Sequence, residues 1–352
     1  MALLLASCEK EKPNNIDSNF NRAAMLEFYA DEIIFPAYTQ SLNGVETLHS
    51  KAELFANNPD TSSLIALQES WKQAVISWQS ACAFNFGPAG EDGIRKSLPE
   101  EIATFPVSSS KIDAVVAGSS YNLNDFNRDA RGFFSIQYLI FDQNISLQAL
   151  ATRYQSENRK NYLLALCEDL TQRISSIKNV WSSSYRNEFI NNAGTDAGSS
   201  TSMLYNEFVK SYEGGKNFKL GLPLGLRPGQ TGVEPELLEA YYSSFSFPII
   251  KAHFQAMENI WRGGSSESGF KAYLKTVDGG EELITRTESQ LSIINNSLNA
   301  IEPDANMNLL LFSEPTPFID LHTELQKNTK NFKSDLSSLI GIAITYSSGD
   351  GD

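Results

Sequence analysis

Apolar side chains recur at steps of three and four residues along nearly the whole chain from about residue 21 onward. This spacing places them on one face of a helix and differs from the step of two that a half-buried strand shows. The best candidate for strand alternation is residues 341–346, which fits a helix end or an extended tail equally well. We therefore predict an all-α protein. Two of the stripes are Ile34, Tyr38, Leu42, Val45, Leu48, Ala52 and Phe55, and His322, Leu325, Thr329, Phe332, Leu336, Leu339 and Ala343.

Residues 191–200 contain only small and polar side chains, which is typical of a linker. Four principal helices precede this segment and about four follow it, so we expect two four-helix-bundle-like domains packed together. The predicted domains span residues 20–190 and 201–348. Within the second domain we expect a loop over residues 214–235 and a long helix over residues 236–261, bent at Pro248.

The first 19 residues resemble the remnant of a bacterial lipoprotein signal followed by a tether. A short apolar run ends at Cys8, and a charged, turn-forming segment follows it. In such signals the cysteine carries the lipid, so Cys8 is the predicted lipidation site. The alternative is a cytosolic N-terminus with a chance cysteine. The lipoprotein interpretation places the protein in the cell envelope, anchored to the outer membrane on its periplasmic or surface face.

The formal net charge of −14 argues against a nucleic acid or an anionic membrane surface as the partner. We expect contact with a membrane only through the lipid anchor. The three cysteines, Cys8, Cys82 and Cys167, include no C-x-x-C pair. Cys82 and Cys167 lie on apolar helical stripes, which favours two free core thiols, although an envelope protein could also pair them.

Signatures of common catalytic and cofactor sites are absent from the sequence. It contains no H-E-x-x-H string, no G-x-S-x-G elbow, no P-loop and no dinucleotide fingerprint. His49, His253 and His322 fall on three different predicted helices, and Glu46 with His49 gives the Glu-x-x-His spacing of di-iron bundles only once. We interpret His253 and His322 as hydrogen-bonded core residues. No catalytic residue, metal or cofactor is predicted.

Several stretches form a series in order along the chain: residues 33–38, Trp71, 84–88, 131–141, 220–224, 239–246, 339–346 and 349–352. Together they resemble the imelysin family of bacterial envelope proteins, also called insulin-cleaving peptidases. The resemblance implies two helical bundles with a groove between them. The family's functional motif is G-x-H-x-x-E, in which the histidine and glutamate are the supposed metal ligands or catalytic pair.

Placed on this sequence, the motif keeps Gly132 but has Phe134 at the histidine position and Gln137 at the glutamate position. Phenylalanine cannot ligate a metal or carry a proton, and glutamine offers a neutral carbonyl in place of a carboxylate. The substitutions favour a protein that is not an enzyme.

The resemblance therefore implies a binding protein whose groove holds a ligand or partner. Because family members are associated with iron or haem acquisition, we expect an iron- or haem-related ligand. Two alternatives are a metallopeptidase with substituted ligands and a purely structural helical envelope protein. In the binding interpretation Phe134 forms an apolar wall and Gln137 a hydrogen-bonding point. The predicted lining is Arg131, Tyr138, Glu239, Tyr242, Ser243 and Ser246.

Overall fold

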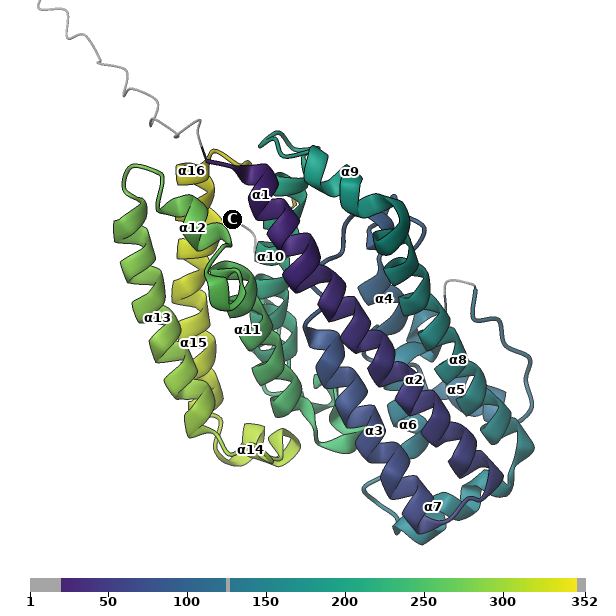
Figure 1. Ribbon diagram of the computed structural model, residues 1–352. Helices are drawn as coiled ribbons and strands as arrows, with labels where there is room; N and C mark the ends of the chain where they lie inside the picture. Colours follow the sequence, from purple (N-terminus) through teal and green to yellow (C-terminus); the bar gives the residue numbers. More distant parts are fainter. Residues whose placement is uncertain (1–19, 125–126, 347–352) are drawn as a thin grey trace, which may run out of the picture.

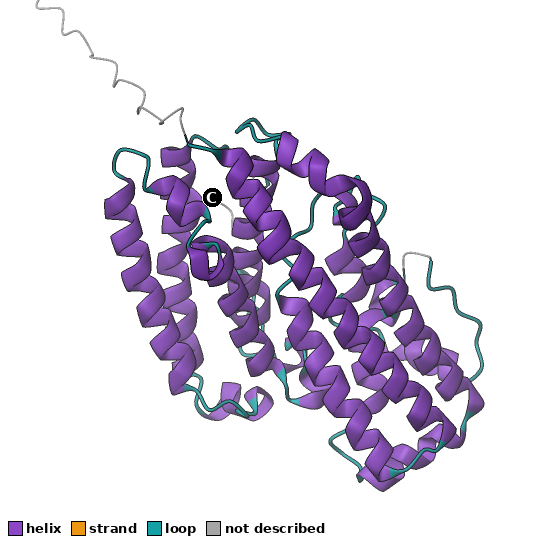
Figure 2. Cartoon of the chain, viewed as in Figure 1, coloured by secondary structure: helices purple, strands orange, loops and turns teal. Residues whose placement is uncertain are grey.

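The computed structural model describes residues 20–124 and 127–346, and within these ranges every regular element is helical (Figure 2). The prediction of an all-α architecture with two helical bundles is confirmed. The predicted lipidation site Cys8 and the tether lie outside the described residues. Among the described helices none is both long and apolar enough to cross a membrane.

The N-terminal bundle is built on α2, α3, α6 and α8, and the long helices α2 and α8 run beside each other (Figure 1). The short helices close its ends and cover α6. The helices of this half are α1 (Arg22–Phe28), α2 (Phe35–Asn57), α3 (Thr61–Gln79), α4 (Leu98–Ile102), α5 (Ser109–Val116), α6 (Gly132–Ile140), α7 (Leu147–Thr152), α8 (Glu157–Val180) and α9 (Arg186–Asn191).

The whole predicted stripe from Ile34 to Phe55 is buried. Local sequence also explains where the helices begin. At the start of α3, the Asp60 carboxylate accepts from the Ser63 backbone N–H at 2.8 Å, and the Ser63 hydroxyl accepts from the Asp60 N–H at 3.2 Å. This reciprocal capping box stabilises the helix by about 1 kcal/mol. Pro36 stands in the first turn of α2, directly after a π-helical segment, Tyr29–Ile34, that joins α1 to α2.

The C-terminal bundle is built on α10, α11, α13 and the nearly continuous helix α15–α16 (Figure 1). A π-helical segment, Asn331–Asp335, connects α15 to α16. The helices of this half are α10 (Ser200–Gly214), α11 (Ser246–Arg262), α12 (Phe270–Leu274), α13 (Gly280–Ala300), α14 (Met307–Ser313), α15 (Thr316–Lys330) and α16 (Leu336–Ile340).

Three predictions for this half are wrong. The start of the predicted loop over residues 214–235 is helical, because a π-helical segment, Gly215–Gly221, continues α10. The predicted long helix over residues 236–261 is shorter, since two 3₁₀ turns, Pro235–Leu237 and Tyr241–Ser243, precede α11. Pro248 does not bend α11, because it occupies the first turn, where a backbone N–H has no helical partner to lose.

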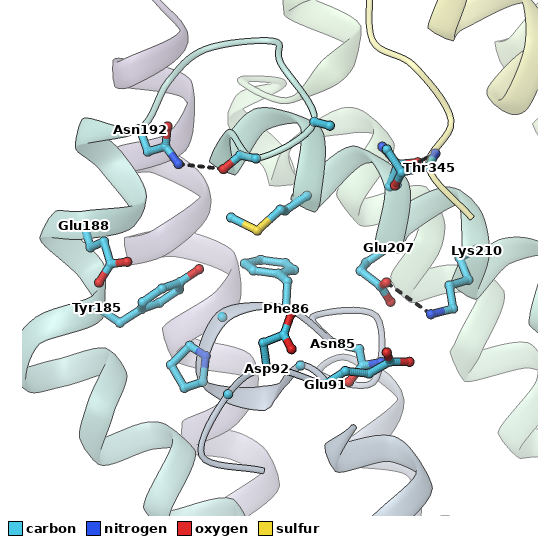
Figure 3. A pocket seen from close by; sticks show the side chains of 18 of the residues that line it. Asn85, Phe86, Glu91, Asp92, Tyr185, Glu188, Asn192, Glu207, Lys210 and Thr345 are labelled. Carbon is cyan, nitrogen blue, oxygen red and sulfur yellow. Dashed lines mark hydrogen bonds and ion pairs between the residues drawn. The ribbon is translucent and has the colours of Figure 1, made fainter. Parts of the chain in front are cut away.

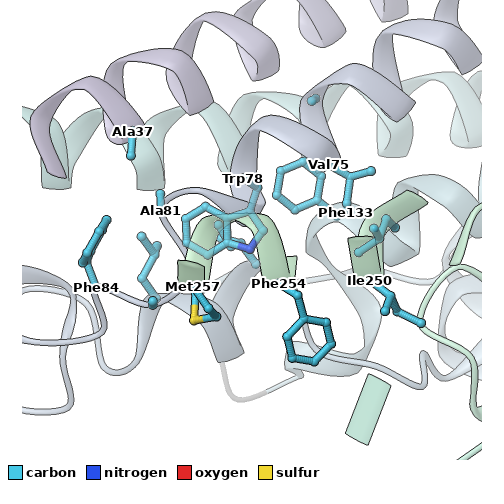
Figure 4. Close-up of a cluster of buried hydrophobic side chains, with 14 of the residues drawn as sticks. Ala37, Val75, Trp78, Ala81, Phe84, Phe133, Ile250, Phe254 and Met257 are labelled. Carbon is cyan, nitrogen blue, oxygen red and sulfur yellow. The ribbon is translucent and has the colours of Figure 1, made fainter. Parts of the chain in front are cut away.

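The two bundles meet where α3 packs against α11. Figure 4 shows Trp78 and Phe133 of the N-terminal bundle facing Phe254 and Met257 of α11. Polar groups also join the two bundles. The hydroxyl of Tyr29 donates to the Ile260 carbonyl at 2.6 Å and accepts from the Phe270 N–H at 3.0 Å. The buried residues of both halves form one contiguous core. The division into two domains at residues 191–200 stays a prediction.

Candidate functional site

The motif helix α6 begins at Gly132, and the structure shows why a glycine stands there. Gly132 has φ +76°, in the left-handed region that disfavours side chains. A Cβ atom at this position would lie 2.1 Å from the Ile102 carbonyl oxygen at the end of α4. Gly132 is therefore required by backbone packing within the N-terminal bundle.

Phe134 is a core residue. Its side chain is only 1% exposed, and its ring lies 6.4 Å from Trp71 and 5.6 Å from Phe105 between ring centroids, both edge-on. Such aromatic contacts stabilise a core beyond simple burial. We expected Phe134 to form an apolar wall of the groove, but the structure places it in the core, where neighbouring aromatic rings cover it.

Gln137 is fully buried and links the two halves of the chain. Its Nε2 donates to the Ser243 hydroxyl at 2.7 Å, and that hydroxyl donates to the Ala240 carbonyl at 3.2 Å. The Gln137 Oε1 atom has no hydrogen-bond partner within the described part of the chain. Gln137 and Ser243 thus form an internal polar contact between the bundles.

Arg131 does not line a groove, contrary to expectation. Its side chain is 2% exposed, and its Nε donates to the Glu101 carbonyl at 3.1 Å. Glu101 also accepts from Arg173 at 2.6 Å, and Arg173 contacts Asp169 at 2.7 Å. Burial and the nearby Arg173 lower the pKa of Arg131. These groups form a buried charge network that holds α4, α6 and α8 together.

Tyr138, Tyr242 and Ser246, three further residues of the predicted lining, contact neighbouring groups of the protein. The Tyr138 hydroxyl donates to Asp113 at 3.0 Å, and its ring stands edge-on to Tyr242 at 5.0 Å. Burial, followed by this hydrogen bond, raises the pKa of Tyr138 to about 12. Ser246 is buried and accepts from the Ala240 N–H at 3.3 Å, at the start of α11.

A pocket of about 430 Å³ opens between the bundles, one aromatic layer above the motif helix. We call it the thiol pocket, because Cys82 lies in its wall. Glu239, from the predicted lining, faces it and pairs with Lys219. Phe105, which packs on Phe134, also lines it. The walls combine Trp78, Cys82, Asn85, Ser97, Pro99, Glu100, Ala103, Thr104 and Phe105 with Glu207, Lys210, Ser211, Gly214, Gly215, Phe218, Lys219, Glu239 and His253.

A second pocket, of about 880 Å³, adjoins the first and shares Asn85, Glu207 and Lys210 with it. Figure 3 shows its carboxylates on both sides of the opening, with Glu207 held by Lys210 at 3.3 Å. Burial raises the pKa of Glu207, and Lys210 opposes this shift. We call this the acidic pocket, since its acidic and basic side chains are Glu91, Asp92, Glu188, Glu207 and Lys210.

A model of the imelysin family matches residues 34–335. The chain belongs to the imelysin family. Iron-regulated protein A of Synechococcus elongatus is 21% identical to this imelysin over 252 residues, which are 69% of this chain and 65% of that protein. The chain thus spans less than two-thirds of the length of that relative.

Two crystal structures share the fold of this imelysin. An imelysin-like protein from Psychrobacter arcticum has a TM-score of 0.76 at 20% identity, over 96% of this chain and 100% of the other. A candidate iron-regulated protein A precursor from Parabacteroides distasonis has a TM-score of 0.74 at 17% identity, over 95% and 97%. At sequence identities this low, the structural similarity establishes only that the proteins share a fold.

The sequence did not reveal that Cys82 and His253 meet in the thiol pocket of this imelysin. His253 is buried and contacts the Ser211 carbonyl, in keeping with a hydrogen-bonded core residue. Its other ring nitrogen lies 3.5 Å from the Cys82 sulfur. The two residues are 171 positions apart, so no local pattern could signal the contact. Both Cys82 and Cys167 are free thiols.

No group of three or more histidine, cysteine, aspartate or glutamate side chains with metal-binding geometry occurs in residues 20–124 and 127–346. His49 is half-buried on α2, 3.9 Å from Glu53. His322 lies on α15 in a separate pocket of the C-terminal bundle. The histidines are therefore dispersed in space as well as in sequence.

His253 should make the protein sensitive to acid. Burial, with a smaller contribution from Lys219, lowers its pKa to about 3, whereas an unfolded histidine titrates near ~6.5. Between these values the unfolded chain binds one proton more, so stability falls as the pH drops through that window. We expect His253→Gln to lose less stability between pH 7 and pH 4 than the unmodified chain, measured by urea unfolding. Thr323→Gln, at an exposed position of α15, is the control for a neutral substitution and should behave as the unmodified chain. Equal acid losses in all three proteins would contradict the assignment.

Proposed function

We propose that this imelysin is a non-catalytic binding protein that holds an iron- or haem-related ligand between its two helical bundles. The observation that carries the proposal is the thiol pocket, whose walls come from both bundles. Its volume of about 430 Å³ lies within the range of about 300–1,000 Å³ that small-molecule sites occupy.

The lining of the thiol pocket suits a ligand with an apolar body and a charged edge. Trp78, Phe105 and Phe218 supply aromatic surface, and Lys219 with Glu239 supplies a charged pair at the wall. Haem has this combination of an apolar ring and carboxylate edges. The relative from Synechococcus elongatus is named for iron regulation, which supports a ligand related to iron.

The motif positions support binding over hydrolysis. Phe134 and Gln137 are buried and carry no acid, base or metal-binding carboxylate. A metallopeptidase with substituted ligands needs at least three donors around one ion, and the described residues contain no such group.

The proposal places the protein at the cell envelope, tethered by a lipid on Cys8 of the N-terminal sequence. The net charge of −14 supports a small ligand or a protein partner over nucleic acid. Membrane contact would then pass through the lipid alone.

Ligand-dependent stability tests the proposal. A ligand that binds only the folded protein stabilises it by about 2.7 kcal/mol at a concentration of about 100 times its dissociation constant. We expect haem or a ferric chelate to raise the thermal unfolding midpoint. Thr104→Trp, which fills the thiol pocket from its wall, should abolish that rise.

The matched control is Thr323→Trp on the exposed face of α15, away from this pocket, and it should respond as the unmodified chain does. A midpoint that stays constant with haem and with ferric chelates would overturn the proposal and favour a structural role. A rise that survives in Thr104→Trp would place the ligand elsewhere.

A further inference from the structure

Cys82 and His253 come from different bundles and meet at the wall of the thiol pocket. The Cys82 sulfur, in the turn after α3, lies 3.5 Å from Nδ1 of His253 on α11. Cys82 is half-buried, whereas Cys167 is fully buried within the N-terminal bundle. A soft sulfur donor and an imidazole nitrogen thus share one accessible position.

The ring of His253 is held in a defined orientation. Its Nε2 lies 2.9 Å from the Ser211 carbonyl, and a carbonyl only accepts, so Nε2 carries the proton and Nδ1 presents its lone pair to Cys82. Gly215 provides the space for the ring, because a Cβ there would lie 2.7 Å from Nε2. A backbone carbonyl that orients one imidazole nitrogen is the usual support of a metal-binding histidine.

The pair is poorly suited to nucleophilic catalysis. Burial raises the pKa of the Cys82 thiol to about 11 and lowers that of His253 to about 3. At neutral pH both groups are therefore uncharged, whereas a catalytic cysteine needs a large thiolate fraction. A neutral imidazole is, however, the form that binds metals, and a metal ion can displace the proton of a thiol.

The distance between the two donors fits one shared ion. Metal bonds of about 2.3 Å to sulfur and about 2.0 Å to nitrogen separate the donors by about 3.5 Å at an angle of about 110°, whereas a linear two-coordinate ion would need about 4.3 Å. The pair therefore fits an ion that takes a further ligand from the thiol pocket. Zinc needs three or four protein donors, and within the described residues no third histidine, cysteine or carboxylate joins this pair in metal-binding geometry, although Glu239 lines the same pocket. Two protein donors that include a thiolate, with a further position open to the pocket, suit a soft monovalent ion.

We propose that Cys82 and His253 bind a copper(I) ion at the junction of the two bundles, with the ion open to the thiol pocket. One sulfur–copper bond and one nitrogen–copper bond form, and the thiol proton leaves to solvent. No electron is transferred. This inference goes beyond the proposed function and does not depend on the ligand proposed there.

The test is an anaerobic copper(I) titration against a competing chelator, with the full chain carrying Cys8→Ser so that Cys82 and Cys167 are its remaining thiols. We expect one ion per chain and the release of about one proton. Cys82→Ser and His253→Gln should each weaken binding by more than about 10-fold. Circular dichroism and the urea midpoint establish that each variant is folded.

The matched control is Cys167→Ala, which removes the other thiol and should leave the affinity unchanged. Unchanged binding in His253→Gln would show that the thiol acts alone and would overturn the paired site. Loss of copper(I) binding in Cys167→Ala would also overturn the paired site. The same holds if the chain with Cys82 and His253 unmodified binds no copper(I). Thermal shifts with haem report separately on the proposed function.

Discussion

Gly132→Ala is expected to lower the free energy of unfolding by about 3 kcal/mol or more. An alanine pays a conformational penalty at φ +76°, and its Cβ would lie 2.1 Å from the Ile102 carbonyl. Relief of that overlap requires α4 to move away from α6, and α4 carries Glu101 of the buried charge network. Urea unfolding, followed by circular dichroism at 222 nm, measures the effect.

Gly214→Ala is the matched control for this substitution. Gly214 ends α10 with ordinary helical geometry, and a Cβ there meets no atom within 4 Å. Alanine should be neutral or stabilise the protein by up to about 1 kcal/mol, because it restricts the unfolded chain. Similar small effects at both glycines would contradict the close approach of α6 to α4.

Restoring the family motif with Phe134→His and Gln137→Glu is expected to destabilise the protein by about 3 kcal/mol or more, without creating a metal site. The histidine would replace a ring packed between Trp71 and Phe105. The glutamate would place a carboxylate at a fully buried position whose present contact is the Ser243 hydroxyl. The urea midpoint and the zinc content after dialysis measure both outcomes.

The control makes the same exchanges at exposed positions, as Phe312→His and Gln155→Glu. Phe312 is 65% exposed on α14, so this pair should change stability by less than about 1 kcal/mol. If the restored motif kept normal stability and retained one zinc ion per chain, the two positions would face an accessible site. Our placement of Phe134 and Gln137 in the core would then be wrong.

The long helices could be predicted because their burial pattern is local. The stripe from Ile34 to Phe55, which runs along α2, repeats without interruption, and its members are buried. The segment Gly215–Gly221 could not be predicted, since paired glycines usually end a helix. Here the glycine at 215 is explained by the His253 ring that packs against it, a contact from α11.

The placement of Phe134 and Gln137 on one face of α6 could be predicted from the sequence, but their exposure to solvent could not. Phe134 and Gln137 are three residues apart and share a face of α6, which periodicity alone shows. Whether that face is open depends on what covers it. Phe105 and Ser243 cover the two positions, and both come from distant segments. Arg131 was likewise misplaced, because a charged side chain is usually exposed unless a network such as that of Glu101 and Arg173 pairs it.

The sequence by itself determined that this imelysin is helical and that its motif lacks an ionisable pair, because periodicity and side-chain chemistry are properties of the chain. Only the tertiary structure decided that the motif lies in the core and that the pocket lies above it. It also brought Cys82 within 3.5 Å of His253. That contact depends on the packing of α3 against α11, and such packing is set by the combined shapes of many side chains far apart in sequence.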